Sequence, residues 1–175
     1  MKIRNLSLIG FMGSGKTTVG SILSKRTGFL FVDIDEVIEW IEGRTVGEIF
    51  DTCGEEYFRN LEARIVKKIY NNQNCVFACG GGVIKRKENI NVIKKNSFVV
   101  YLYVSPPVAY KRLEKEETRP LLRVDDRKKA IETILKERER LYKSCADLIV
   151  DTDNKEPEQI ADEILQILQN IKGFK

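Results

Sequence analysis

The chain has 175 residues, of which 42% are hydrophobic and 32% charged, the size and composition of one globular domain. Its formal net charge of +4 is spread along the sequence and interleaved with acids, without the basic and aromatic patches of a nucleic-acid groove, so no nucleic-acid partner is expected. Histidine is absent, which excludes Ser-His-Asp triads and HExxH zinc sites; catalysis would depend on carboxylates, lysine, arginine, backbone amides or a metal.

No stretch approaches the roughly 18 uncharged apolar residues needed to cross a bilayer. The apolar run at residues 6–9 is too short for a signal peptide and leads directly into a glycine-rich loop. The cysteines form no CxxC pair and show no zinc spacing, which fits reduced thiols: Cys53, Cys75, Cys79 and Cys145. We therefore expect a cytoplasmic protein with no membrane partner.

Strand and helix patterns alternate along the chain. Short runs rich in Val, Ile and Phe predict five strands, at residues 6–9, 29–33, 75–79, 98–104 and 147–150. Helical patterns lie at residues 16–27, 34–42, 55–70, 106–115 and 127–143, and a last helix follows Pro157. Because the strand patterns are mostly apolar on both faces, they indicate a parallel sheet covered by helices, in one α/β domain spanning residues 1–175.

The strongest motif follows the first predicted strand. Residues 10–17 read GFMGSGKT and match the phosphate-binding loop GxxxxGK[ST], placed between a strand and a helix as that loop requires. Glycines let backbone amides approach phosphates closely, and the helix adds its positive dipole end. Lys16 would reach the β- and γ-phosphates, and the Thr17 hydroxyl would bind Mg²⁺, so the motif predicts binding of MgATP.

Two carboxylates, Asp33 and Asp35, follow the second predicted strand. Ligands of open α/β sheets bind at the carboxyl ends of strands, so one could hold Mg²⁺ through water while the other contacts a substrate hydroxyl. The alternative is a helix N-cap. The phosphate loop makes the functional interpretation the stronger one.

Three consecutive glycines, residues 80–82, follow the third predicted strand. Glycine costs strand and helix stability, so the run predicts a ligand packed against bare backbone, with a flexible turn as the alternative.

Three arginines are candidates for an anionic ligand, because guanidinium pairs naturally with carboxylate or phosphate. Arg59 lies in FRNLE, Arg119 precedes Pro120, and Arg138 lies in RERLY. Each alone is compatible with an ordinary surface residue, and Arg59 could simply pair with Glu62. The charge-rich segment around Arg119 is either a surface loop or a mobile lid.

Together these motifs resemble a known family. GFMGSGKTTVG, DID, FRNLE, CGGG, RPLL and ERERLY occur in the order and spacing of the shikimate kinases, in the nucleoside-monophosphate-kinase branch of P-loop folds. The resemblance extends from about residue 3 to the final helix. It implies a three-layer α/β/α P-loop kinase with a five-stranded parallel sheet, a substrate-binding region at about residues 34–62 and a mobile lid at about residues 112–127.

The resemblance also implies a function: ATP-dependent phosphorylation of shikimate to shikimate 3-phosphate, in the chorismate route to aromatic amino acids, with ATP and Mg²⁺. It makes Lys16, Asp35 and Arg119 catalytic, assigns Thr17 and Asp33 to the metal, and has Glu62 orient Arg59. The implied nucleotide-binding residues are Gly13, Ser14, Gly15, Lys16, Thr17, Thr18, Arg112, Arg119 and Pro157. The implied shikimate-binding residues are Asp35, Arg59, Gly80, Gly81, Gly82 and Arg138.

Two alternatives stay open from sequence. One is a P-loop kinase of another small acceptor, gluconate or a nucleoside monophosphate; the other is a nucleotide-binding regulator that has lost phosphate transfer. A monomer is expected, since no sustained heptad or additional apolar helix face is evident.

Overall fold

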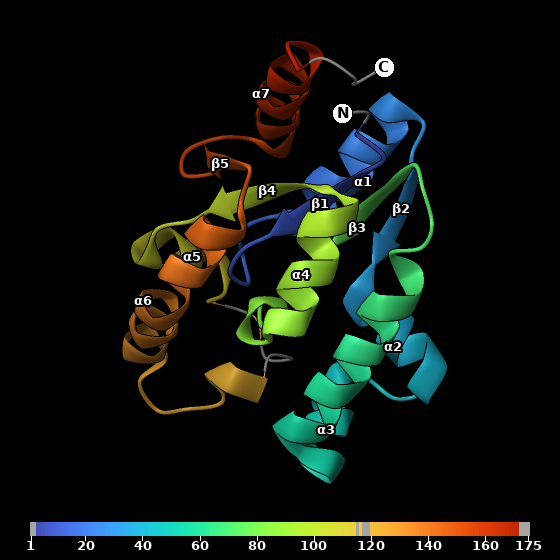
Figure 1. The fold of residues 1–175 in the computed structure, drawn as a ribbon. Helices are drawn as coiled ribbons and strands as arrows, with labels where there is room; N and C mark the ends of the chain where they lie inside the picture. Colours follow the sequence, from blue (N-terminus) through green and yellow to red (C-terminus); the bar gives the residue numbers. More distant parts are fainter. Residues whose placement is uncertain (1–2, 115, 117–119, 172–175) are drawn as a thin grey trace.

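A five-stranded parallel sheet organises the computed structural model, which describes residues 3–114, 116 and 120–171 (Figure 1). The strands lie in the order β2-β3-β1-β4-β5. Their bounds are β1 Asn5–Ile9, β2 Leu30–Asp33, β3 Cys75–Ala78, β4 Phe98–Tyr103 and β5 Leu148–Asp151. The predicted five-stranded parallel sheet of an α/β fold is confirmed, with bounds that differ by one or two residues from those predicted.

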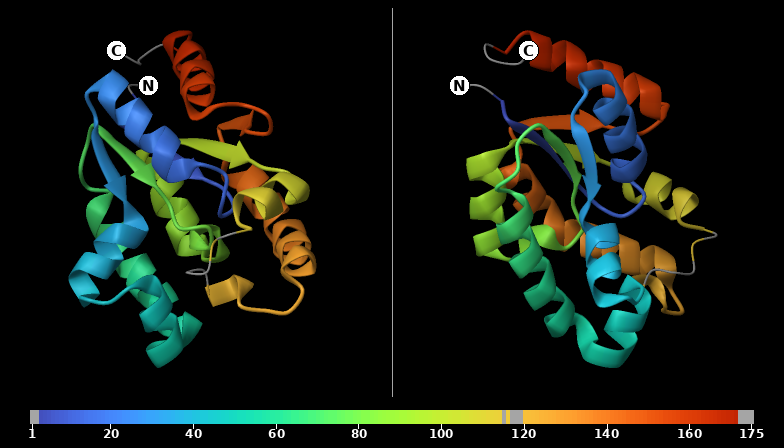
Figure 2. Two further views of the ribbon diagram at one scale, coloured as in Figure 1. Left: turned by 180° about the vertical axis from the view of Figure 1, so that it is seen from behind. Right: turned by 90° about the vertical axis from the view of Figure 1, so that its right-hand side faces the viewer.

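Helices cover both faces of the sheet (Figure 2). The α-helices are α1 Lys16–Thr27, α2 Ile34–Glu42, α3 Val46–Ile69, α4 Lys87–Asn96, α5 Pro106–Arg112, α6 Arg127–Cys145 and α7 Pro157–Gln169, and the 3₁₀ turns are η1 Val83–Lys85 and η2 Pro120–Leu122. Apolar side chains of α1 and α7 pack on one face, and those of α2, α3, α4 and α6 pack on the other. β1 and β3 are buried along their whole length; β3 is apolar throughout, whereas β1 also buries the polar side chains of Asn5 and Ser7.

Four helices differ from the sequence prediction. The helix predicted at residues 55–70 begins earlier, at Val46, where Thr45 and Glu48 form a capping box, and it is kinked at Gly54, whose φ is 81°. Helix α4 was not predicted, because only Asn89 and Ile93 of this polar segment are buried, too few for a visible stripe. In addition, α5 ends at Arg112 and α6 extends to Cys145.

Strand register brings the predicted motifs to one edge of the sheet. Ala78 of β3 pairs with Leu8 of β1 on one side and with Asp33 of β2 on the other. The phosphate loop, Asp33 and the glycine run therefore leave the sheet side by side, at the carboxyl ends of three neighbouring strands. Among the described residues, no helix is long and apolar enough to cross a membrane.

Candidate active site

The loop between β1 and α1 has the backbone of a phosphate cradle. Gly13 and Gly15 have φ of 78° and 88°, values that disfavour residues with a side chain, and Gly15 caps the N-terminus of α1. Lys16 Nζ donates to the carbonyl oxygens of Gly10 and Phe11, at 3.0 and 2.9 Å. The ammonium group thus lies over the loop, next to the positive end of the helix dipole, where an anion is stabilised.

Asp33 caps α2 and also contacts the phosphate loop. Its Oδ1 accepts the backbone N–H of Asp35 at 3.0 Å and so caps α2. Its Oδ2 accepts the Thr17 hydroxyl at 2.8 Å. The cap fixes the carboxylate, which presents its second oxygen to the phosphate loop.

The pair formed by Thr17 and Asp33 fits Mg²⁺, because both offer hard oxygen ligands at the mouth of the loop. Within residues 3–114, 116 and 120–171, no three His, Cys, Asp or Glu side chains gather as a metal site. A magnesium ion here would therefore take most of its ligands from water and nucleotide phosphates, as this ion usually does.

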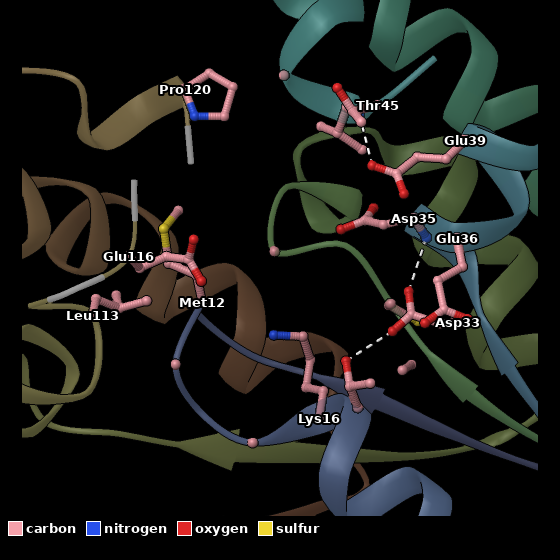
Figure 3. A pocket seen from close by; sticks show the side chains of 18 of the residues that line it. Met12, Lys16, Asp33, Asp35, Glu36, Glu39, Thr45, Leu113, Glu116 and Pro120 are labelled. Atoms are coloured by element: carbon pink, nitrogen blue, oxygen red, sulfur yellow. Dashed lines mark hydrogen bonds between the residues drawn. The ribbon is translucent and has the colours of Figure 1, made fainter. Parts of the chain in front are cut away.

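Two pockets adjoin at the same edge of the sheet. The larger has a volume of about 800 Å³, and Lys16 and Asp33 point into it (Figure 3). The smaller, of about 60 Å³, is lined by Arg59, Arg138 and the glycines at 80–82. Residues that line both are Met12, Asp35, Val46, Gly81 and Pro120. Asp35 thus lies where a ligand in one pocket would meet a ligand in the other.

The glycine run is required by close packing of side chains against its backbone. A Cβ on Gly80 would lie 2.8 Å from both Asp35 Oδ1 and Glu62 Oε1. A Cβ on Gly82 would overlap the guanidinium group of Arg59. Any side chain at either position would displace a carboxyl or guanidinium group, so these glycines leave room for the acidic and basic side chains that pack against their backbone.

Arg59 is held by two acids of its own helix. Its Nη1 donates to both oxygens of Glu62 at 3.0 and 3.1 Å, and its Nε donates to Glu55 at 3.2 Å. Glu55 also accepts Lys85 Nζ at 2.7 Å. The pairing with Glu62 considered from sequence is present. Arg59 itself lines the smaller pocket, whereas Glu62 is buried behind it and is not among the lining residues.

Burial of this pair perturbs its ionisation. Glu62 is fully buried, and burial raises the pKa of its carboxyl to about 7 although Arg59 acts in the opposite direction. For Arg59, burial opposes the charge, yet Glu62 and Glu55 raise the pKa of the guanidinium above its usual value. Arg59 therefore stays charged, whereas Glu62 changes charge near neutral pH.

Arg138 also lines the smaller pocket, from α6. It is 6% exposed, and its Nη1 donates to the carbonyl oxygen of Gly81 at 3.1 Å. The three side chains that sequence assigned to the acceptor, Asp35, Arg59 and Arg138, thus line one pocket although they come from α2, α3 and α6.

The residues assigned to the nucleotide differ in whether they line the larger pocket. Arg112 lines the larger pocket and donates to the carbonyl oxygens of Gly13 at 3.1 Å and Thr152 at 2.7 Å. Thr18 also lines this pocket. Ser14 is buried and lines neither pocket, so its contribution would come from its backbone amide.

Two further nucleotide-side assignments, Pro157 and Arg119, stay predictions. Pro157 begins α7 and is not among the lining residues. Arg119 lies outside the described residues, so its predicted role stays a prediction.

An apolar wall of the smaller pocket was not identified from sequence. Phe50 and Phe58 pack with ring centroids 4.9 Å apart, and the Arg59 guanidinium lies 5.0 Å from the Phe58 centroid, within cation–π range. A helix spanning residues 46–69 would have placed both rings on one helix, about two turns apart, but the first part of α3 was not predicted.

An ion pair across the larger pocket was also missed. Arg123 Nη1 donates to both oxygens of Asp51, at 2.8 and 2.7 Å, and joins the segment after η2 to α3. Both residues line the larger pocket. Nothing in the sequence relates two residues so far apart in the chain.

The fold and the loop together define a class: a P-loop protein with the phosphate cradle between β1 and α1 and a second pocket beside it. A family model described as shikimate kinase matches residues 12–169. The shikimate kinase of Thermodesulfovibrio yellowstonii is 40% identical over 173 residues, which cover 99% of each chain.

Solved structures agree with this match. The shikimate kinase from Acinetobacter baumannii in complex with shikimate has a TM-score of 0.95 and 34% identity, and the match covers 97% of this chain and 95% of that one. The shikimate kinase from Aquifex aeolicus has a TM-score of 0.84 and 36% identity, over 97% of this chain and 99% of that one. The chain belongs to the shikimate kinase family.

Proposed function

We propose that this protein transfers the γ-phosphate of ATP to the 3-hydroxyl of shikimate, giving ADP and shikimate 3-phosphate on the chorismate route to aromatic amino acids. The observation that carries the proposal is the pocket lined by Asp35, Arg59 and Arg138 beside the phosphate loop. Shikimate bears one carboxylate and three hydroxyls, so it needs cations at one end and a hydrogen-bond acceptor at the other.

ATP occupies the larger pocket, with its phosphates on the backbone amides of residues 13–17 and on Lys16. To reach the β- and γ-phosphates, the Lys16 ammonium exchanges its contacts with loop carbonyls for phosphate oxygens. Thr17 and Asp33 would hold Mg²⁺, which when bound would neutralise charge on those phosphates. Arg112, which donates to the Gly13 carbonyl oxygen of the phosphate loop, lies beside the adenine.

Shikimate occupies the smaller pocket. Arg59 and Arg138 bind its carboxylate, and both enter the pocket already buried, so little side-chain entropy is lost on binding. Glu62 keeps the Arg59 guanidinium oriented toward the pocket. The backbone of residues 80–82 packs against the ring, and Asp35 accepts a hydrogen bond from the 3-hydroxyl.

The chemical step is an in-line displacement. A bond forms between the 3-oxygen and the γ-phosphorus, the bond from that phosphorus to the β,γ-bridging oxygen breaks, and ADP leaves. Asp35 orients the attacking oxygen and takes its proton. Arg119, carried by the lid at residues 112–127, neutralises charge on the transferring group, a role worth roughly 10³–10⁵ in rate in related transfers. Closure of that lid excludes water as a competing acceptor.

A coupled assay of ADP release tests the proposal against a panel of acceptors: shikimate, gluconate and nucleoside monophosphates. We expect kcat/KM for shikimate to exceed that of every other acceptor by more than about tenfold, which corresponds to about 1.4 kcal/mol in transition-state binding. A preference for gluconate or a nucleotide of that size would contradict the acceptor assignment. Binding of MgATP without transfer to any acceptor would instead favour a regulator.

A further inference from the structure

A buried tyrosine on α6 contacts the same backbone oxygen as Arg138. Tyr142 follows Arg138 by one helical turn, so both side chains face the glycine run. The Tyr142 hydroxyl donates to the carbonyl oxygen of Gly81, and Arg138 Nη1 donates to the same oxygen at 3.1 Å. A carbonyl oxygen has two lone pairs and can accept both bonds.

The Tyr142 hydroxyl is available as a donor at every working pH. The residue is 0% exposed, and burial raises the pKa of its phenol to about 12. The group therefore stays protonated and donates its hydrogen to Gly81.

The bond to Gly81 fixes a peptide unit that would otherwise turn easily. Gly81 and Gly82 both lack a Cβ, so the peptide between them has more rotational freedom than any other pair of residues would give it. A trans peptide is planar, so a carbonyl oxygen drawn toward α6 sends the N–H of Gly82 in the opposite direction. The hydroxyl thereby sets the orientation of a peptide that lines the smaller pocket.

The same peptide lies against the phosphate loop. A Cβ on Gly81 would be 3.5 Å from the Gly10 carbonyl oxygen and 3.7 Å from the Met12 nitrogen, and Gly81 lines both pockets. A rotation of the Gly81–Gly82 peptide would change the shape of the site where the nucleotide and the acceptor meet. It would also remove the oxygen that anchors the Arg138 guanidinium.

The ring of Tyr142 is fixed by a second buried tyrosine. Tyr101, on β4, stacks on it with ring centroids 5.0 Å apart and an angle of 20° between the planes. Both residues are 0% exposed. The Tyr101 hydroxyl is buried without a hydrogen-bond partner among the described atoms, so the two phenols differ in one respect: only that of Tyr142 holds the glycine run.

We infer that Tyr142 is a positioning residue for the acceptor: its hydroxyl holds the Gly81–Gly82 peptide and, through the shared oxygen, the Arg138 guanidinium in the geometry that binds the acceptor. The inference rests on the proposed function, because acceptor phosphorylation is its readout.

The test compares two isosteric variants, Tyr142→Phe and the matched control Tyr101→Phe. Each removes one buried hydroxyl from the same stacked pair and leaves the ring in place. We would measure KM for shikimate, KM for ATP, kcat and the melting temperature of both variants and of the unmodified protein.

We expect Tyr142→Phe to raise KM for shikimate by about fivefold to tenfold, the effect of one lost hydrogen bond in a binding geometry. KM for ATP should stay within about twofold, as should both KM values of Tyr101→Phe. Equal acceptor KM values for the two variants would overturn the inference. Parallel losses for ATP and shikimate in Tyr142→Phe would also overturn it, because they indicate a general structural role.

A different result would refute the proposed function. Absence of shikimate phosphorylation by the unmodified protein refutes that function and, with it, this inference. Activity in the unmodified protein together with an unchanged Tyr142→Phe variant refutes the inference alone.

Discussion

A side chain at Gly82 would displace the Arg59 guanidinium and weaken binding of the acceptor by a calculable amount. In Gly82→Ala the new Cβ would lie 2.5 Å from Arg59 Nη1, whereas ordinary contacts begin near 3.5 Å, so the guanidinium must move by about 1 Å. Backbone strain is not involved, because Gly82 has φ of −102° and ψ of 0°, which alanine adopts.

The displacement breaks the geometry of a buried ion pair. Arg59 Nη1 lies 3.0 and 3.1 Å from the two Glu62 oxygens, so a shift of that size takes at least one bond beyond hydrogen-bonding distance. A hydrogen bond between charged groups contributes about 1.5–3 kcal/mol. We therefore expect KM for shikimate to rise at least about tenfold, with KM for ATP within about twofold.

A double-mutant cycle in the acceptor assay isolates the cause. In an Arg59→Ala background the Cβ at Gly82 no longer meets a guanidinium, so adding Gly82→Ala should change KM by less than about twofold. If Gly82→Ala costs as much in the Arg59→Ala background as in the unmodified protein, the steric argument is refuted.

Three further predictions concern single groups. Asp35→Asn should leave the affinity for MgATP nearly intact, measured by nucleotide titration, and lower turnover by more than about tenfold; near-normal turnover would remove Asp35 from the chemical step. Because burial raises the pKa of Glu62 to about 7, kcat/KM for shikimate should fall as the pH drops through about 7, and the fold should lose stability as the pH rises from 4.5 to about 7, since the folded state binds that proton more tightly than the unfolded chain. Both effects should be absent from Glu62→Gln when activity and urea unfolding are measured as a function of pH. If kcat/KM of this variant still falls at acidic pH as in the unmodified protein, another group is responsible for the ionisation. Finally, hydrogen bonds with Thr52 and Arg44 hold the pKa of exposed Cys53 below its usual value, so an alkylating reagent should modify this thiol well before the three buried ones. Mass spectrometry that finds the first label on another cysteine would contradict this.

The parts of the fold that follow a short repeating rule could be predicted from sequence. Each strand is a compact and mostly apolar run, and GFMGSGKT occupies one continuous stretch, so the strands and the phosphate loop could be predicted without long-range information. Helix α4 does not follow such a rule: it buries only Asn89 and Ile93, and its stability comes from packing that the sequence does not display.

The candidate site was predictable as residue types but not as geometry. Sequence identified the glycine run and Arg59, yet the reason that Gly82 must lack a side chain appears only when Arg59 lies on top of it. Tyr142 could not be identified from sequence as a residue of the site, because core packing alone predicts an aromatic residue on the buried face of a helix. The Asp51–Arg123 pair likewise arises from the folding of segments that are distant in the chain.

The central claim is that two adjoining pockets, joined at Asp35, bring an ATP phosphate to one hydroxyl of shikimate. Nuclear magnetic resonance of phosphorus and protons, applied to the protein with MgATP and shikimate, tests it most directly. The account predicts one new phosphate ester, at the 3-oxygen, formed in equal amount with ADP. Release of inorganic phosphate without an ester, or an ester at another hydroxyl, would contradict it.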